Sequence, residues 1–577
     1  MLGKRSPQYG MLEADHLYLD HVGRETFYGF LASLRGRLFR DEDFAVFYCP
    51  DNGRTSVPPS LLATALLLQT YEGVSDEEAK ARADFDLRWK VALGIGIEDR
   101  PFAKSTLQLF RSHLVLHDQV RAVFTRSLTL ARETGYLKAR KLRVVLDTSY
   151  ILGRGAVKDT YNLLADGMVQ VVRVLAQGEG AEPAAWARAH GLSRYFGTSL
   201  KGEAAIDWDD PAARRQLLGS MVADADGLLE ATRQVLAALD PEGAWHQRIC
   251  QAAGLLAQLL LQDIERKADG PAIKEGVSPD RVVSVHDPQM RHGRKSASKR
   301  FDGHKAAIAV DPESQLITAV EVLPGNAPDH REALALVEQA EANTGAEVVE
   351  AMGDCAYGDG QTRQTFAEAG RQLVAKVPNR RGQAYFPKEA FSIDLETMTC
   401  VCPAGQECRT ITTISSGDRY GAPGTPLRAF RFDGAVCDAC PLRPACVRAR
   451  PGQGRTVMLH PQEALLQEAR AFQQSEEFAP YRKLRQAAEH RLARLMQLGV
   501  RQARYFGRTK TRFQLLMTAA VANLTLVATK VGMMRGRRGE RASITSCRSG
   551  PVALLVVACQ MCIVHMVANK RNAVSQG

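Results

Sequence analysis

The pattern of apolar and polar residues changes along the chain, and its first part, residues 17–135, follows a helical period. Ser75, followed three residues later by Glu78, forms a capping-box signature at one helix start. Ser60 precedes another long apolar-periodic stretch, and Gly breaks separate such stretches from one another. We therefore predict an all-helical amino-terminal domain over residues 17–135.

From residue 142 the pattern is that of alternating strands and helices. The run LRVVLDTS predicts a strand over 143–147, and a turn leads from it into a helical stretch. GHKAAIAVD and SQLITAVEVL, separated by Pro312-Glu313, predict a hairpin. A helix, a strand over 348–353, another helix and a strand over 372–377 follow. Elements in this order predict a mixed-sheet α/β domain.

Insertions and end segments account for the rest of the chain. Helical stretches and a polar, Gly- and Pro-marked connector at 267–281 interrupt the α/β domain. The fold class is therefore multidomain α + α/β. The predicted parts are the sheet core at 142–150 and 281–380, a helical insertion at 151–280, a cysteine-rich insertion at 381–465, carboxy-terminal helices at 475–530 and an atypical tail at 535–577.

Composition indicates a folded protein outside the membrane class. A chain of 577 residues exceeds one ordinary domain, and we expect three or four. Hydrophobic residues at 45% and charged residues at 24% exclude the disordered and membrane classes. The apolar run at 551–567 is short for a helical span, and we expect no signal peptide at the start. The net charge of +11 suits a polyanionic partner, although a mildly basic enzyme would look similar.

Two aspartates follow predicted strands of the α/β domain. Asp147 ends the first strand, and Asp354 follows the apolar-rich run EVVEAMG. Adjacent strands would bring both acids to the same end of the sheet, where two carboxylates repel unless a cation lies between them. Mg²⁺ takes oxygen ligands and is commonly held by one or two carboxylates together with substrate phosphates. We expect Asp159, Asp287 and Asp359 to be caps or turn residues.

A third acid is expected from a helix beyond the last strand. The segment PYRKLRQAAEHRLARLMQLG, residues 480–499, carries an apolar stripe. Tyr481, Arg485 and Glu489 recur four residues apart and project from one broad face. A face that presents Arg485 and Glu489 together suits a metal ion and a phosphate. An ordinary intrahelical Arg–Glu pair is the alternative.

Four stretches of the chain together carry a family resemblance: LDTSYILGRGAVKDTYNLL, SVHDPQMRHGRKSASKRFDGHK, GDCAYGDG and ARYFGRTKTRFQLLMTAAVANL. They resemble bacterial insertion-sequence transposases of the DDE type, in the subgroup with a helical amino-terminal domain ahead of a split RNase H-like domain. The likeness runs from about residue 17 to about residue 530. It implies an RNase H-like mixed-sheet catalytic domain with a helical insertion and a cysteine-rich insertion.

The resemblance also implies roles for single residues. The Asp of the strand-end Leu-Asp-Thr motif matches Asp147, and the Asp of the Gly-Asp-x-x-Tyr-Gly motif matches Asp354. The Glu of the late helix matches Glu489. These three are then the catalytic, metal-binding acids, while Tyr481 and Arg485 contact DNA.

The late helix departs from the family pattern at one point. The family often spaces this helix as Tyr-x-x-Arg-x-x-x-Glu, whereas three residues separate Tyr481 from Arg485 here. Arg482 is therefore an alternative to Arg485.

The resemblance implies a reaction and its partners. Metal-dependent hydrolysis at transposon ends would be followed by attack of the freed 3′-OH on target DNA. Two Mg²⁺ or Mn²⁺ ions roughly 3.5–4 Å apart would activate the attacking oxygen and stabilise the leaving one. The implied partner is double-stranded DNA, bound by a homodimer or higher synaptic assembly. No membrane is involved, and the implied location is the cytoplasm, at the nucleoid. The sequence has no G-x-S-x-G motif, and GRGAVK at 153–158 lacks the P-loop spacing.

Two basic segments lie close to the predicted catalytic elements. Residues 291–305 precede the hairpin and residues 501–513 follow the late helix. Lys and Arg at this density hold phosphates without reading sequence, and Tyr505 and Phe506 would stack on an unpaired base. A solvated charged surface is the alternative for either segment alone. The DNA-binding candidates are Arg294, Lys295, Lys299, Arg300, Lys305, Arg504, Arg508 and Lys510.

Six of the twelve cysteines fall between residues 400 and 446. Such clustering indicates a metal site before disulfides. Cys400 and Cys408 are alternatives for the fourth ligand, and reduced thiols without a metal are the other interpretation. The expected ligands of a closed, structural four-thiolate zinc site are Cys402, Cys437, Cys440 and Cys446.

The motifs leave three interpretations of the whole chain. Retention of the three acids favours an active transposase. A DNA-binding relic or repressor without catalysis, and a metal nuclease that cuts without joining, remain as alternatives. The helical domain at 17–135 would then supply either a recognition helix or a dimerising module.

Overall fold

The computed structural model describes residues 1–5, 14–296, 298–378, 385–415 and 426–532. Contacts divide the chain into two units. The first contains Met1–Lys138 and the residues from Ala520 onward, and the second contains Ala139–Ala519. Each unit is described by itself. The predicted tail at 535–577, with its apolar run at 551–567, lies outside the described residues.

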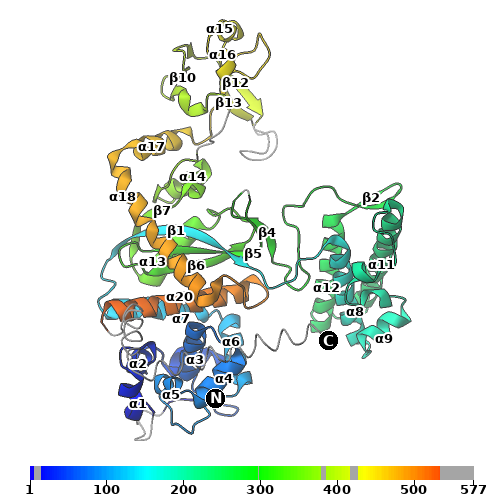
Figure 1. Cartoon of the computed structure of the whole chain (residues 1–577), viewed down its shortest axis with the longest axis vertical. Coiled ribbons are helices and arrows are strands. Elements are labelled where there is room, and N and C mark those ends of the chain that lie inside the picture. The colour runs from blue at the N-terminus through cyan, green and yellow to red at the C-terminus, as the bar shows by residue number, and fades with distance from the viewer. Residues whose placement is uncertain (6–13, 297, 379–384, 416–425, 533–577) are drawn as a thin grey trace, which may run out of the picture. The chain divides into compact units, whose positions relative to one another are not determined.

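The first unit is helical, as the apolar period predicts. Ser75 and Glu78 form both bonds of the capping box at the start of α4. The helix predicted after Ser60 instead begins at Pro59, because Pro58 and Pro59 preset the backbone of the first turn, and Ser60 is buried within it. The helices are α1 Ala14–Val22, α2 Phe27–Ser33, α3 Pro59–Glu72, α4 Asp76–Phe85, α5 Leu87–Leu93, α6 Lys104–Leu116 and α7 Val120–Glu133 (Figure 1).

The second unit is built on a mixed sheet. Its strands lie in the order β4-β5-β1-β7-β8, and β6 also pairs with β5. The central strand β1 is antiparallel to β5 and parallel to β7, and β7 is parallel to β8. The strands are β1 Lys141–Leu152, β4 Arg291–Arg294, β5 Arg300–Val310, β6 Ile317–Pro324, β7 Glu347–Met352 and β8 Gln372–Val374 (Figure 1).

The prediction that the first strand ends at Asp147 is wrong. Strand β1 continues to Leu152, and its last residue pairs with Gly303 of β5. The β-branched and aromatic residues in Thr148–Leu152 favour an extended backbone, and β5 is long enough to pair with all of them. Strand β8 is shorter than its predicted span of 372–377, whereas β7 matches the span predicted at 348–353 within one residue.

Helices flank the sheet and bring the late part of the chain back to it. Helix α19 packs against β1 and β5. The single helix predicted at 480–499 is divided at Arg485, which keeps helical backbone angles, and it ends in a one-turn π-helix, η7. The helices are α13 Ala333–Thr344, α14 Gly360–Glu368, α17 Glu463–Gln474, α18 Ala479–Leu484, α19 Gln486–Leu495, η7 Met496–Val500 and α20 Arg508–Lys530.

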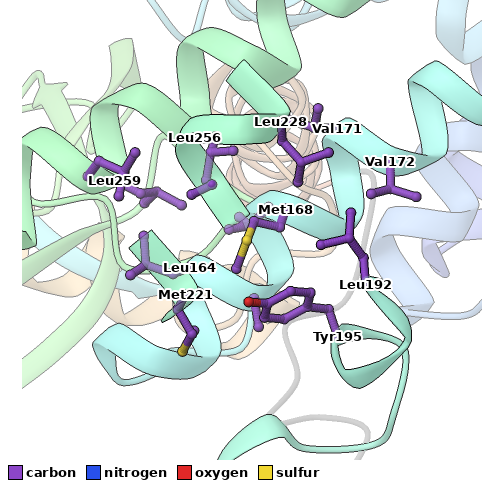
Figure 2. Packing of buried hydrophobic residues seen from close by; sticks show 14 of the residues in the cluster. Leu164, Met168, Val171, Val172, Leu192, Tyr195, Met221, Leu228, Leu256 and Leu259 are labelled. Carbon is purple, nitrogen blue, oxygen red and sulfur yellow. The ribbon is translucent and has the colours of Figure 1, made fainter. Parts of the chain in front are cut away.

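The helical insertion has a hydrophobic core of its own. Figure 2 shows Leu164, Met168 and Val171 packed with Leu256 and Leu259. Asp159 caps the first helix, as expected of it. The polar connector predicted at 267–281 is wrong at its start, because β2 Ile264–Lys267 and β3 Gly270–Ile273 pair as a hairpin. The helices are α8 Thr160–Gly178, α9 Pro183–Ala189, α10 Leu200–Glu203, α11 Pro211–Ala237 and α12 Ala244–Asp263.

The cysteine-rich segment holds two small three-stranded sheets and two short helices. Phe391, Phe430 and Phe432 form a small buried cluster with Cys400 and Cys408. The first sheet contains β9 Ser392–Asp394, β10 Thr399–Val401 and β11 Glu407–Cys408, the second contains β12 Ile411–Ser415, β13 Pro426–Arg431 and β14 Thr456–Met458, and the helices are α15 Gly434–Asp438 and α16 Arg443–Cys446.

One described helix, Arg508–Lys530, is long and apolar enough to cross a membrane by length and composition. Since 83% of its most apolar window is buried, it is weak evidence for a membrane span and resembles a helix of a protein core.

Candidate active site

The register of the sheet places the two predicted catalytic aspartates side by side. In the parallel pair of β1 and β7, Val145 lies opposite Met352. Asp147 and Asp354 each follow two residues further on, so both reach the same end of the two strands. Their side chains line one cleft of about 850 Å³, which we call the acid cleft.

The third acid reaches the same cleft from helix α19. Ala488 and Leu495 are fully buried, which seats the helix and leaves its other side toward the cleft. Arg485 and Glu489 both line the acid cleft. The structure therefore brings Asp147, Asp354 and Glu489 together from three distant parts of the sequence, together with Arg485.

The charges of the acid cleft act on one another. Burial, together with the negative charges of Asp354 and Glu489, raises the pKa of Asp147 to about 6. The Thr148 backbone N–H, which donates to Asp147 Oδ1 at 2.7 Å, and the Arg485 cation oppose this rise in pKa. The cleft thus concentrates negative charge where a cation would relieve it.

The Gly-Asp-Cys-Ala-Tyr-Gly motif fixes Asp354 through its own backbone. Asp354 Oδ1 accepts a hydrogen bond of 2.8 Å from the Ala356 N–H and so caps the short turn Cys355–Tyr357. A Cβ at position 353 would lie 2.7 Å from the Tyr357 ring, so only Gly353 allows this close approach. The turn holds the carboxylate at the rim of the sheet and buries the tyrosine behind it.

Tyr357 is a buried neighbour of the acids. Its hydroxyl has no hydrogen-bond partner among the described residues. Burial raises the pKa of Tyr357 well above its ordinary value, and the charges of Asp147, Asp329 and Asp354 add to the rise. The buried hydroxyl therefore lies close to three carboxylates without a hydrogen bond to any of them.

Cations line the rest of the acid cleft. Of the predicted DNA-binding residues, Arg294, Lys295 and Lys305 line it along with Arg485. Lys305 Nζ donates to the Ala327 carbonyl and to Asp329 Oδ1, each at 2.7 Å, so this lysine is held by the protein itself.

Tyr481 lies on the same helical stretch but does not line the acid cleft. Its hydroxyl donates to Glu350 Oε1 on β7 at 2.7 Å, and its ring packs against Phe472 and Phe478. Burial and the Glu350 carboxylate raise the pKa of Tyr481 to about 12. In the structure this tyrosine ties the helix to the sheet.

The other predicted DNA-binding residues do not line the acid cleft. Lys299 stands over the Tyr150 ring, with Nζ 5.2 Å from the ring centroid, and Arg300 pairs with Arg294 across β5 and β4. The remaining three are at the start of α20 or just before it: Arg504, Arg508 and Lys510. The backbone N–H groups of the first two bond Gln514 and Gln289.

The four cysteines predicted to bind zinc line a second, much smaller cavity of about 30 Å³, which we call the cysteine cavity. Tight turns hold two of them, since Gly405 N–H donates to the Cys402 carbonyl at 2.8 Å and Cys440 N–H to the Cys437 carbonyl at 3.2 Å. Burial raises the pKa of the Cys446 thiol, while the nearby Arg455 cation opposes the rise.

The alternative ligands Cys400 and Cys408 lie elsewhere. They face each other across β10 and β11, and both are buried in the small apolar cluster. Burial raises the pKa of Cys400 to about 12. Neither lines the cysteine cavity, which favours Cys402 as the fourth member of that group.

Neither group of side chains is drawn together to metal-binding distances. Over the described ranges, no three His, Cys, Asp or Glu side chains form a group that could hold a metal ion as they stand. The acid cleft and the cysteine cavity therefore gather the right kinds of donor atoms in one place, but their side chains would have to move inward to bind.

Sequence reasoning missed several residues of the acid cleft. Ser149, Tyr150, Asp329 and Arg501 line it but are absent from the predicted catalytic and DNA-binding set. Tyr150 lies three residues after Asp147 in the quoted motif, and Arg501 opens the second basic segment, so both carried a signal. Asp329 had none, because it lies in a loop after β6 without a recognisable pattern.

Comparison with known proteins gives two family matches. Residues 401–528 match the family described as Transposase DDE domain, and residues 18–113 match the one described as Transposase domain (DUF772). Together they indicate an insertion-sequence transposase of the DDE type. The DDE match includes Glu489 and all of the cysteine cavity's thiols, whereas Asp147 and Asp354 precede it. No curated protein and no solved structure matches the chain.

Proposed function

We propose that the chain is a DDE transposase that cleaves the ends of its element in a metal-dependent reaction and joins them to target DNA. The observation that carries this proposal is the convergence of Asp147, Asp354 and Glu489 in one cleft. These acids belong to a strand, to the end of a neighbouring strand and to a late helix. Such a convergence over three distant segments is expected of a reaction centre and has no obvious structural use.

The sheet supports an RNase H-like catalytic domain. Apart from β4, the strands lie in the order β6-β5-β1-β7-β8 across the sheet. In order of sequence these are the third, second, first, fourth and fifth strands of the core, and only the second, β5, runs antiparallel to the first. This is the order that an RNase H-like sheet requires. The helical insertion interrupts it between its first and second strands, as the resemblance implies.

The residues of the acid cleft fit a divalent cation. Carboxylate oxygens are the ligands that Mg²⁺ and Mn²⁺ prefer. After burial, the carboxylates of Asp354 and Glu489 raise the pKa of Asp147, and a cation bound among the three acids would counter that rise. Asp147, Asp354 and Glu489 would hold two such ions, which supply activation of the attacking oxygen and stabilisation of the leaving one.

The protein's own contribution is binding and orientation of DNA. Arg294, Lys295 and Arg485 line the cleft beside the acids and would hold phosphates of double-stranded DNA, at the element's end and in the target. We place this reaction in the cytoplasm at the nucleoid, in a homodimer or larger synaptic assembly, since two element ends must be held together.

A structural zinc ion in the cysteine cavity is part of the same proposal. Cys402, Cys437, Cys440 and Cys446 supply the donor set of a closed four-thiolate site. With only two small sheets and short helices around it, this segment has a small core, and a bound metal would stabilise it.

Strand cleavage and joining test the proposed function. The purified protein, with Mg²⁺ or Mn²⁺, is incubated with a labelled duplex taken from the sequence that borders the gene, in parallel with Asp354→Asn. Metal-dependent nicking and joining that the variant loses support a transposase. Nicking without joining would indicate a nuclease, and tight binding without cleavage by either protein would leave a DNA-binding relic.

A further inference from the structure

Arg501 lines the acid cleft and has no part in the reaction proposed above. Its guanidinium carbon lies 4.1 Å from the centroid of the Tyr150 ring. Its Nη1 lies 3.3 Å from the Tyr150 carbonyl oxygen and 3.5 Å from Ser149 Oγ. The guanidinium group thus lies over the ring and is fixed at Nη1, and among the described residues its other N–H groups donate no hydrogen bond.

The backbone around Arg501 is built onto the end of β1. Leu152 N–H donates to the Arg501 carbonyl at 2.9 Å, and Ala503 N–H donates to the Leu152 carbonyl at 2.8 Å. Gln502 forms a parallel bridge with Leu152. The chain can turn from the helix onto the strand because Gly499 adopts a φ of 95°, which side chains other than glycine's disfavour. Arg501 is therefore positioned by the same strand that carries Asp147.

Tyr150 is held as firmly as the arginine it supports. Phe301 packs against it with ring centroids 5.2 Å apart, and Lys295 and Lys299 stand 5.7 and 5.2 Å from its ring centroid. The ammonium group of Lys299 lowers the pKa of the Tyr150 hydroxyl. Three cations thus surround one aromatic ring: Arg501 and Lys295, which line the cleft, and Lys299, which does not. We call them the cationic wall.

The three cations of this wall are not neutralised by ion pairs. Across the part of the chain that the structure describes, Arg501, Lys295 and Lys299 form no ion pair with a carboxylate. Three mutually repelling cations are held close together, which costs free energy unless an anion binds between them. The anion that the proposed function would bring to the cleft is a nucleic-acid phosphate.

We propose that Arg501, held by stacking on Tyr150, binds a phosphate of the DNA strand that flanks the scissile phosphate. Tyr150 lies three residues beyond Asp147, which is about 10 Å along an extended strand. The contacted phosphate is therefore a neighbour of the scissile one. Arg501 is a DNA-binding residue, and Tyr150 is the positioning residue that sets its orientation. This inference rests on the proposed function, since it assumes DNA in the acid cleft.

Replacement of the arginine by lysine separates charge from geometry. A guanidinium offers two parallel N–H donors to a phosphate and stacks on an aromatic ring, whereas an ammonium is a point charge on a flexible stem. We expect Arg501→Lys to keep the salt dependence of DNA binding and to lose most of the affinity that depends on orientation.

The experiment is a scan of single neutral phosphates. Duplexes from the sequence that borders the gene carry one methylphosphonate at each position in turn, and their binding to the full-length protein is measured. We expect one flanking position at which the wild type binds roughly 10- to 100-fold more weakly. Arg501→Ala should bind the unmodified duplex more weakly and lose this sensitivity at that position only. Its binding should also show a salt slope lower by about 0.9.

Matched variants separate positioning from folding. Tyr150→Phe keeps the ring and should behave like the wild type, whereas Tyr150→Leu should show the loss seen in Arg501→Ala. Arg233→Ala, which removes an exposed cation of the helical insertion, should leave the scan unchanged. Thermal unfolding of each variant shows whether it is folded.

Two results would overturn the inference. One is an Arg501→Ala scan equal to that of the wild type at every position, and the other is a Tyr150→Leu protein that is folded and binds as the wild type does. Because the scan measures binding, it gives an answer even for a protein that never cleaves DNA. Absence of cleavage would thus remove the proposed function while the phosphate contact stood.

Discussion

The acid cleft and the cysteine cavity both gather donor atoms that suit metal ions, yet the chain assembles them by opposite means. Residues 147, 354 and 489 meet because a parallel strand pair and a packed helix bring them together. The thiols of the cysteine cavity all lie within residues 402–446 and are set by tight turns. The first arrangement depends on the fold of the sheet, the second on local spacing.

This difference indicates what a bound metal ion would do at each site. The acids are held by a well-packed sheet, so burial and then their mutual repulsion raise the pKa of Asp147 when no cation is bound. The thiols are neutral when protonated and surrounded by small elements, so a metal would shape the segment that binds it. An ion in the acid cleft would serve chemistry, and one in the cysteine cavity would serve folding.

The largest effect is expected from the acids. Asp147→Asn keeps the size of the side chain and removes its charge, so metal-dependent cleavage should fall by about 10³-fold or more. The rate of strand cleavage on a labelled duplex measures it. Asp359→Asn is the matched control, because Asn also caps a helix and Asp359 caps α14 outside the cleft. Equal rates for Asp147→Asn and the wild type would remove this acid from the reaction.

The cysteine cavity should respond through metal content and stability. Wild-type protein should carry about one zinc ion per chain, and Cys437→Ser should carry almost none. Without the ion, the cysteine-rich segment should become sensitive to protease. Metal analysis and limited proteolysis measure both effects. Cys250→Ser, at an exposed cysteine of α12, should change neither. Wild-type protein with four freely titrating thiols and no zinc would contradict the assignment.

A pH dependence separates the two sites further. The folded pKa of Asp147, about 6, lies above its ordinary value, so its stabilising contribution is complete below pH 4 and is lost as the pH rises through 6. In metal-free protein the loss is roughly 2–3 kcal/mol. Asp147→Asn should therefore be more stable than the wild type at pH 7 to 8 by about this amount, and the difference should vanish near pH 4.

Denaturant unfolding of both proteins in chelator, over this pH range, measures the difference. Added Mg²⁺ should stabilise the wild type and leave Asp147→Asn almost unchanged. A constant difference between the two proteins at every pH would show that the carboxylate is not the source.

The smallest effect is expected at Cys400. Its side chain is fully buried in β10 and faces Cys408. Cys400→Ala removes only a buried sulfur atom, so the free energy of unfolding should fall by about 1 kcal/mol. Zinc content should stay at the wild-type value, as metal analysis would show. A variant that loses its zinc would instead make Cys400 a ligand.

Sequence reasoning found the elements better than their limits. The hairpin β5–β6 and the strand β7 follow from alternation and a Pro-marked turn, which are local signals. The end of β1 was misplaced because its extension to Leu152 depends on pairing with β5, a contact with residues far along the chain. The break at Arg485 was also missed, because no Pro or Gly marks it. The π-helical turn after α19 was missed as well.

The candidate site was predictable where residues of one type recur in a motif. Asp147 and Asp354 could be paired because parallel strands share an end, and the cysteines because of their spacing. The stacking of Arg501 on Tyr150 could not be foreseen, because the late segment reaches β1 only in the folded chain. Tyr481 was expected at DNA, and its bond to Glu350 depends on a helix docking that no local pattern shows.

The helical insertion has a consequence for how the protein is made. The central strand β1 leaves the ribosome before the whole insertion, and its partners β5 and β7 follow only after residues 300 and 347. At about 5–20 residues per second, this apolar strand waits on the order of ten seconds or more for its neighbours. The insertion, with its own core, can fold during that time and bring the two ends of its segment together. Synthesis would then close the sheet around an already folded bridge, and Glu489 would complete the acid cleft last.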